Sequence, residues 1–93
     1  MLKRTIRVVN MSASQEKLNQ IVKAIDEIIE DYTVPKNVKR NLENAKNALL
    51  TEDEVSIRVN KALNELDELS EDTNMQSYTR TQVWNIVSML ETI

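Results

Sequence analysis

Residues 26–35 read DEIIEDYTVP and residues 67–76 read DELSEDTNMQ, so paired acids, an apolar residue and a turn occur twice at an offset of 41 positions. Each copy lies between stretches whose apolar residues recur every three or four positions, which is typical of helices that bury one face. Two explanations are available. The pattern is either a duplicated metal site or a duplicated way of ending one helix and starting the next.

Apolar spacing predicts four helices. The first ends near Asp31, and the second begins at Pro35, whose preset φ suits the first helical position, and ends near Leu50. The apolar stripe of the first helix comprises Leu18, Ile21, Val22, Ile25, Ile28, Ile29 and Tyr32. The stripes of the other three comprise Val38, Leu42, Ala45 and Leu49; Val55, Val59, Ala62, Leu63, Leu66 and Leu69; and Val83, Ile86, Val87 and Leu90, to which Ile93 can be added.

Two capping boxes mark predicted helix starts. Ser12 and Gln15 have the S-x-x-Q spacing in which a hydroxyl and an amide satisfy the free N–H groups of a first turn. Thr51 and Glu54 repeat this spacing in the stretch TEDE. We therefore expect the first helix to begin at Ser12 and the third at Thr51, with a very tight link before the third.

The two halves predict two αα-hairpins related by internal duplication at an offset of about 41 residues. Two hairpins with short links close on each other as a four-helix bundle. The expected fold is thus all-α, with a four-helix bundle domain over residues 12–93. Residues 1–11 share no periodicity with the rest and form an N-terminal arm or extension that we expect to be disordered. A short strand-like arm, or translation starting at Met11, are the alternatives.

Composition excludes several kinds of chemistry. The 93 residues include no Cys, His, Gly or Phe, which removes disulfides, thiol nucleophiles, Cys/His zinc sites, histidine acid–base catalysis and glycine-lined phosphate loops. No apolar run is long enough to cross a bilayer, so we expect a cytoplasmic protein. The net charge is −3 although the first ten residues are basic, so nucleic acid is not an expected partner.

Three stretches resemble a known family. They are DYTVPKNVKR at 31–40, DTNMQSYTR at 72–80 and WNIVSMLETI at 84–93. They resemble the uncharacterised protein family 0147, which comprises small archaeal proteins of unassigned function, over about residues 14–93. The resemblance implies an all-helical bundle of two hairpins and supplies no activity. The family pattern has proline in the second turn too, where this chain has Gln76, and the N-terminal arm lies outside the resemblance.

The repeated acids have metal-ligand spacing, because Glu27 and Asp31, like Glu68 and Asp72, are four residues apart. Carboxylate di-metal bundles, however, combine inward-facing Glu residues with an E-x-x-H motif, and the chain has no histidine. Asp31 and Asp72 can instead accept hydrogen bonds from amides of the following turn. We therefore interpret the motif as structural and predict no metal ion and no cofactor.

The function expected from these features is a non-enzymatic interaction module that binds a protein partner or itself, with no small-molecule substrate identified. Trp84 lies beside the apolar stripe of the fourth helix, either at the core edge or as a surface anchor, and Tyr78 and Ile57 complete the candidate interface. One alternative is a carboxylate-based metal-binding protein or hydrolase. A second is a nucleic-acid accessory protein that uses the arm and the basic cluster Lys36, Lys39 and Arg40.

Overall fold

The structure, a computed structural model, describes the backbone of residues 2–71 and 75–93, and the side chains in these ranges from Gln15 onward. Its four helices are α1 (Leu2–Ile29), α2 (Lys36–Leu49), α3 (Val55–Ser70) and α4 (Ser77–Glu91), and the described ranges contain no strand. The all-α prediction is confirmed. Asp72 falls outside the described residues.

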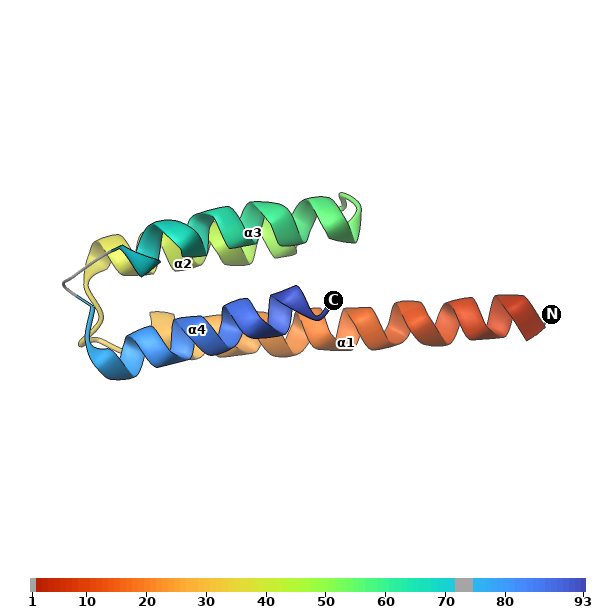
Figure 1. Cartoon of the computed structure of the whole chain (residues 1–93), viewed down its shortest axis with the longest axis horizontal. Coiled ribbons are helices and arrows are strands. Elements are labelled where there is room, and N and C mark those ends of the chain that lie inside the picture. The colour runs from red at the N-terminus through yellow and green to blue at the C-terminus, as the bar shows by residue number, and fades with distance from the viewer. Residues whose placement is uncertain (1, 72–74) are drawn as a thin grey trace.

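The helices form a bundle with alternating directions (Figure 1). Each packs against its neighbours along the chain, and α4 also packs against α1, which closes the ring. The turn between α1 and α2 lies at the same end of the bundle as the C-terminus of α3 and the N-terminus of α4 (Figure 1). Both copies of the acidic motif therefore end a helix at this one end of the molecule.

The core repeats with the same offset as the sequence motif. Among the described side chains, every buried residue except Leu18 belongs to a pair separated by 41 positions, and Leu18 corresponds to the partly buried Val59. The eight pairs are Ile21 with Ala62, Ile25 with Leu66, Ile28 with Leu69, Val34 with Met75, Val38 with Thr79, Leu42 with Val83, Ala45 with Ile86, and Leu49 with Leu90. The two hairpins therefore build equivalent halves of one core, as the repeat predicts.

The two halves differ where one has alanine and the other isoleucine. Ala45 on α2 and Ala62 on α3 are buried, whereas their equivalents on α4 and α1 are Ile86 and Ile21. The distance between two packed helices depends on the side chains at their contact, so small residues permit a closer approach. The α2–α3 pair is accordingly the most closely packed in the bundle.

The start of α1 lies before the predicted capping box. The helix as described begins at Leu2, so Ser12 lies inside it rather than at its start. The Gln15 side chain donates from Nε2 to Oδ1 of Asn19 at 3.1 Å, one turn further along the helix, and so does not reach back to a helix start. The S-x-x-Q spacing also fits a helix interior, because its members lie on one face.

Two other predicted starts move by a few residues. α3 begins at Val55 with Glu54 in the N-cap position, while Thr51 donates from its hydroxyl to the carbonyl oxygen of Ala48 at 3.1 Å. Thr51 thus serves the end of α2 rather than the start of α3. Pro35 is the N-cap residue of α2, one position before its predicted place, and accepts a hydrogen bond from the Lys39 amide.

Tyr32 was predicted in the core stripe and lies outside it. Its side chain is 91% exposed, because α1 ends at Ile29 and the helical periodicity no longer applies beyond that residue. The buried residues that close this end of the core are instead Val34 and Met75, both in turns. The periodic pattern does not identify them, since neither belongs to a helix.

Candidate interaction surface on α4

Helix α4 is poor in charge. Its 15 residues include two charged side chains, Arg80 and Glu91, whereas α2 has five in 14 residues and α3 has five in 16. A surface helix of a small protein normally presents charged residues on its solvent side. The outer side of α4 is therefore chemically different from those of α2 and α3.

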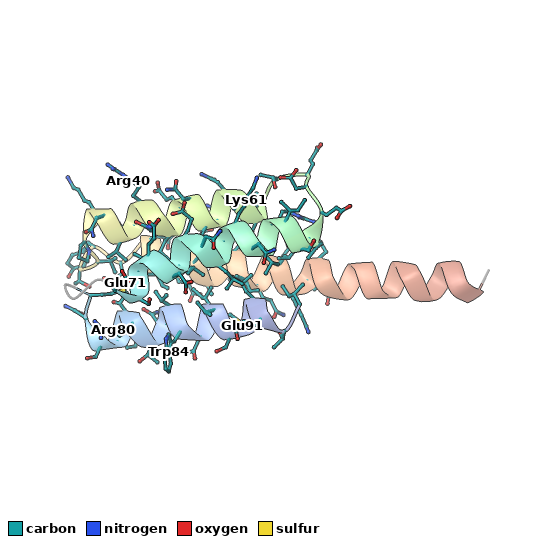
Figure 2. The ribbon with its side chains drawn as sticks, turned by 45° about the horizontal axis from the view of Figure 1, so that its top comes forward. Arg40, Lys61, Glu71, Arg80, Trp84 and Glu91 are labelled. Carbon is teal, nitrogen blue, oxygen red and sulfur yellow. The ribbon has the colours of Figure 1, made fainter. Side chains whose placement is uncertain are left out.

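Trp84 lies on this outer side. The buried residues of α4 are Thr79, Val83, Ile86 and Leu90, and Trp84 follows Val83 by one position, about 100° around the helix. Its side chain is 71% exposed and points away from the bundle (Figure 2). Trp84 therefore lies on the surface and not at the edge of the core.

Uncharged side chains extend from Trp84 around the helix. We define the α4 face as Ser77, Tyr78, Thr81, Trp84, Asn85 and Ser88, all of which are exposed. At 100° per residue these positions span an arc of about 120°, with Trp84 at one edge and Tyr78 at the other. Ser77, Thr81, Asn85 and Ser88, which lie between the two aromatic residues, have shorter side chains than Trp84 and Tyr78. The α4 face is therefore lower in its middle than at its two aromatic edges.

Ile57, the third candidate for the interface, is not on this face. It belongs to α3 and is 43% exposed, on the side of α3 opposite its buried residues. Two further large hydrophobic side chains are exposed, Tyr32 beyond the end of α1 and Leu50 at the end of α2. The sequence pattern placed Tyr32 in the core stripe and did not identify Leu50 as exposed. Both follow the last residue of a helix. The structure thus brings Trp84 and Tyr78 together on one helix and leaves Ile57 apart.

Asp31 acts on its own turn. Its Oδ1 accepts hydrogen bonds from the Thr33 amide at 2.9 Å and from the Thr33 hydroxyl at 2.6 Å. The side-chain bond and, after it, the backbone bond hold the pKa of the Asp31 carboxyl below its usual value, since both favour the charged form. The carboxylate is therefore engaged in ending α1 and ordering the turn toward α2.

The acids of α3 make a contact across the bundle. The amide nitrogen Nδ2 of Asn41 on α2 donates to carboxylate oxygens of Glu65 at 3.2 Å and of Glu68 at 2.9 Å. Within the described part of the chain, no three His, Cys, Asp or Glu side chains are grouped so that they could hold a metal ion.

The equivalent contact between α4 and α1 is incomplete. Gln82 corresponds to Asn41 at the offset of 41, and Glu27 corresponds to Glu68. Gln82 and Glu27 line a cavity of about 340 Å³ between α1 and α4, where Oε1 of Gln82 is buried without a hydrogen-bond partner in the structure. The α2–α3 pair is therefore joined by a polar contact whose counterpart on α1–α4 opens onto a cavity.

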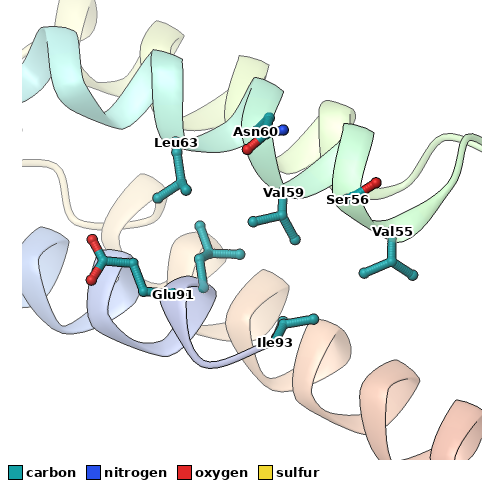
Figure 3. A pocket seen from close by; sticks show the side chains of 8 residues that line it. Val55, Ser56, Val59, Asn60, Leu63, Glu91 and Ile93 are labelled. Carbon is teal, nitrogen blue, oxygen red and sulfur yellow. The ribbon is translucent and has the colours of Figure 1, made fainter.

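A groove with apolar and polar walls lies at the opposite end of the bundle from the acidic turns. We define the α3–α4 groove by Val55, Val59 and Leu63 of α3 with Leu90 and Ile93 at the end of the chain, around a volume of about 500 Å³. Figure 3 shows Val59 and Ile93 facing each other across it, with Glu91 at its edge. The groove exists because α4 ends at Glu91 while α3 runs on beyond that level.

The remaining features of the surface are simple. Lys36, Lys39 and Arg40 lie in the first turns of α2, and the Arg40 side chain points into solvent (Figure 2). Within the described residues, no helix has the length and apolar character that would be needed to span a membrane.

Comparison with known proteins places the chain in a family. The sequence model of the uncharacterised protein family UPF0147 matches residues 5–93, so the match includes most of the N-terminal segment that the quoted stretches leave out. A UPF0147 protein of Methanocaldococcus jannaschii is 44% identical over 91 residues, which cover 92% of this chain and 98% of the relative. One of Archaeoglobus fulgidus is 39% identical over 82 residues, covering 88% and 94%.

Two solved structures are similar in both sequence and fold. The crystal structure of a protein of unknown function, MMP1188, is 50% identical with a TM-score of 0.83 and covers 85% of this chain and 91% of that chain. A UPF0147 protein of Thermoplasma acidophilum is 35% identical with a TM-score of 0.79 and covers 85% and 94%. The chain belongs to the uncharacterised protein family UPF0147.

Proposed function

We propose that this protein is a non-enzymatic, cytoplasmic interaction module whose α4 face binds another protein. The observation that supports the proposal is the exposure of Trp84, which is 71% accessible at the edge of a helix face without charged residues. The centres of protein interfaces are depleted in charge and enriched in Trp and Tyr, because rigid aromatic rings lose little entropy when buried.

The shape of the α4 face favours a helical partner. Ser77, Thr81 and Ser88 are small and lie between the rings of Trp84 and Tyr78, so a helix of the partner can approach the α4 backbone closely. Arg80 and Glu91, on the other side of Trp84, supply one charge of each sign at the rim. Rim charges of this kind set orientation and association rate more than affinity.

The acidic motif does not compete with this proposal as a source of function. Asp31 is hydrogen-bonded to Thr33, and Glu68 is hydrogen-bonded to Asn41, so each has a structural contact. Neither interaction requires a ligand. The interaction proposal therefore uses residues without a structural role, whereas a carboxylate site would use residues that already make structural hydrogen bonds.

The test compares three single substitutions in the full chain used as bait in native extract. Trp84→Ala and Tyr78→Ala change the α4 face, and Tyr32→Ala removes a still more exposed aromatic ring, 91% accessible, outside it. We expect all three variants to keep the parent's stability within about 0.5 kcal/mol. A protein that co-purifies with the parent and with Tyr32→Ala should be lost with the other two.

The affinity between this protein and the purified co-purifying partner then tests whether the α4 face is the binding surface. A buried aromatic hot-spot residue contributes about 2 kcal/mol or more, so Trp84→Ala should weaken binding by roughly 30-fold or more. Unchanged affinity for Trp84→Ala, or equal losses for Trp84→Ala and Tyr32→Ala, would refute the α4 face as the binding surface.

A further inference from the structure

Helix α1 has 28 residues, against 14 to 16 in the other three helices, and its first half runs past the end of the bundle (Figure 1). We define the α1 projection as residues 2–14. Thr92, beyond the last residue of α4, lies at the level of Lys17 and Gln20 of α1, and the described core begins at Leu18. The projection therefore extends beyond the helices that pack against the rest of α1.

A helix of this composition is not stable in isolation. Helices shorter than about 12 to 15 residues are marginal in water, and Thr5, Ile6, Val8 and Val9 are β-branched residues that lower helix propensity. The first turn contains Lys3 and Arg4 and no acid, so charge at the positive end of the helix is also unfavourable. The projection continues the packed part of α1, but its own composition adds little helix stability, so a packing partner would stabilise it.

The α3–α4 groove is a surface that a helix such as the α1 projection could cover. At this level α3 continues to Val55, whereas α4 has ended, so one position of the four-helix ring is vacant. Val55, Val59 and Ile93 are only partly buried along it (Figure 3). A helix that continued the path of α4 would cover these side chains and restore four helices at this end.

The charges of the two features are opposite. The projection has Lys3, Arg4 and Arg7 and no acidic residue. Acidic residues border the groove, with Glu91 in its lining and the exposed Glu52, Asp53 and Glu54 in the turn immediately before α3. Groove and projection occur on every copy of the chain, so two copies can satisfy both without any other molecule.

We propose that two copies of the chain form a two-fold symmetric dimer in which the α1 projection of each lies in the α3–α4 groove of the other. A two-fold axis perpendicular to α1 reverses the second projection, so that it runs in the direction of α4 and antiparallel to α1 and α3. This is the direction that the alternating bundle requires at the vacant position (Figure 1). The contact is isologous and closes after two copies.

The dimer brings the basic projection of one copy, which contains Arg4 and Arg7, to the end of the bundle where Glu52 and Glu91 of the other copy lie. It leaves the residues of the α4 face free and shares with the proposed interface only Glu91, at the rim. Substitutions on the α4 face should not alter the dimer, and substitutions in the projection should not prevent binding to the α4 face.

Charge reversal in the full chain tests the pairing. One variant combines Arg4→Glu with Arg7→Glu, and a second combines Glu52→Lys with Glu91→Lys. The first adds acids near the N-terminus of α1, where they favour helix formation, so a lost dimer cannot be attributed to a melted helix. A control with equal charge change, Lys36→Glu with Arg40→Glu, alters the opposite end of the bundle.

Sedimentation equilibrium at low ionic strength gives the outcome. The parent and the control should sediment with twice the 10.8 kDa chain mass, and each of the first two variants with the mass of one chain. An equimolar mixture of those two should recover the dimer, because both of its grooves then face a projection of opposite charge. The proposal would be overturned if the parent were monomeric or formed an open-ended polymer. It would also be overturned if either charge-reversed variant were dimeric by itself, or if their mixture stayed monomeric.

Discussion

Val34 and Met75 lie 41 residues apart and close the same end of the core, each 5% exposed and each directly before an N-cap residue. Those N-cap residues, Pro35 and Gln76, have nearly the same backbone, with φ and ψ of −59° and 151° in the first and −63° and 153° in the second. The two turns therefore direct their helices alike, although one lacks the proline.

Substitution at this closing position should be costly. Met75→Ala removes a buried side chain, and such truncations typically cost about 2 to 5 kcal/mol. Tyr78→Ala, three residues away but exposed, should cost no more than about 0.5 kcal/mol. Urea unfolding followed by circular dichroism measures both. Equal costs would mean that Met75 does not close the core.

Asp31 should give a pH-dependent contribution. Its pKa is lowered in the folded protein, so its stabilisation is present above the unfolded value of about 3.9 and is lost as pH falls through the folded pKa. The melting temperature of Asp31→Ala should therefore lie below that of the parent at neutral pH, and the difference should shrink below about pH 4. If Glu30→Ala lowered the melting temperature with the same pH dependence, the effect would come from negative charge at the end of α1 and not from the hydrogen bonds between Asp31 and Thr33.

The ion pair between α1 and α2 should contribute modestly. Lys46 Nζ lies 2.7 Å from Asp26 Oδ1, with side chains 31% and 40% accessible, whereas Lys61 and Asp53 are 3.6 Å apart and more exposed. A double-mutant cycle with alanine should give a coupling of about 0.2 to 1 kcal/mol for the first pair and less for the second. Added salt should weaken both, and a larger value for Lys61–Asp53 would contradict this ranking.

Divalent cations should leave stability unchanged. A ligand that binds the native state alone must raise the melting temperature by mass action. We expect no shift with Mg²⁺, Mn²⁺ or Ca²⁺ at low millimolar concentration, measured by circular dichroism. A concentration-dependent rise that Glu27→Gln abolishes would restore the carboxylate site as an explanation of the repeated acids.

Helical periodicity was sufficient to predict most of the core, because burial of one face is the main constraint on each helix. Ile25, Leu42, Leu66 and Ile86 were all identified in this way and all are buried. Thr79 was missed, since its hydroxyl removes it from an apolar stripe even though it occupies the position equivalent to Val38.

Helix ends were predicted less well, because capping residues have several possible partners. Thr51 fits an N-cap by spacing, yet its hydroxyl donates to the end of the preceding helix. The surface was predictable only in part. Trp84 is one position from Val83, and a helical wheel cannot decide between a core edge and an exposed ring without the positions of the neighbouring helices.

The equivalence of the two halves has a consequence for the origin of the fold. A bundle whose buried positions repeat at 41 residues is in effect a homodimer of hairpins fused through the turn at 50–54. Tandem copying of a gene for one self-associating hairpin, followed by divergence of the two copies, would produce such a protein. Ala45 and Ile86 are equivalent in position but not in size, a difference that a true homodimer cannot have, because both of its chains carry the same residue.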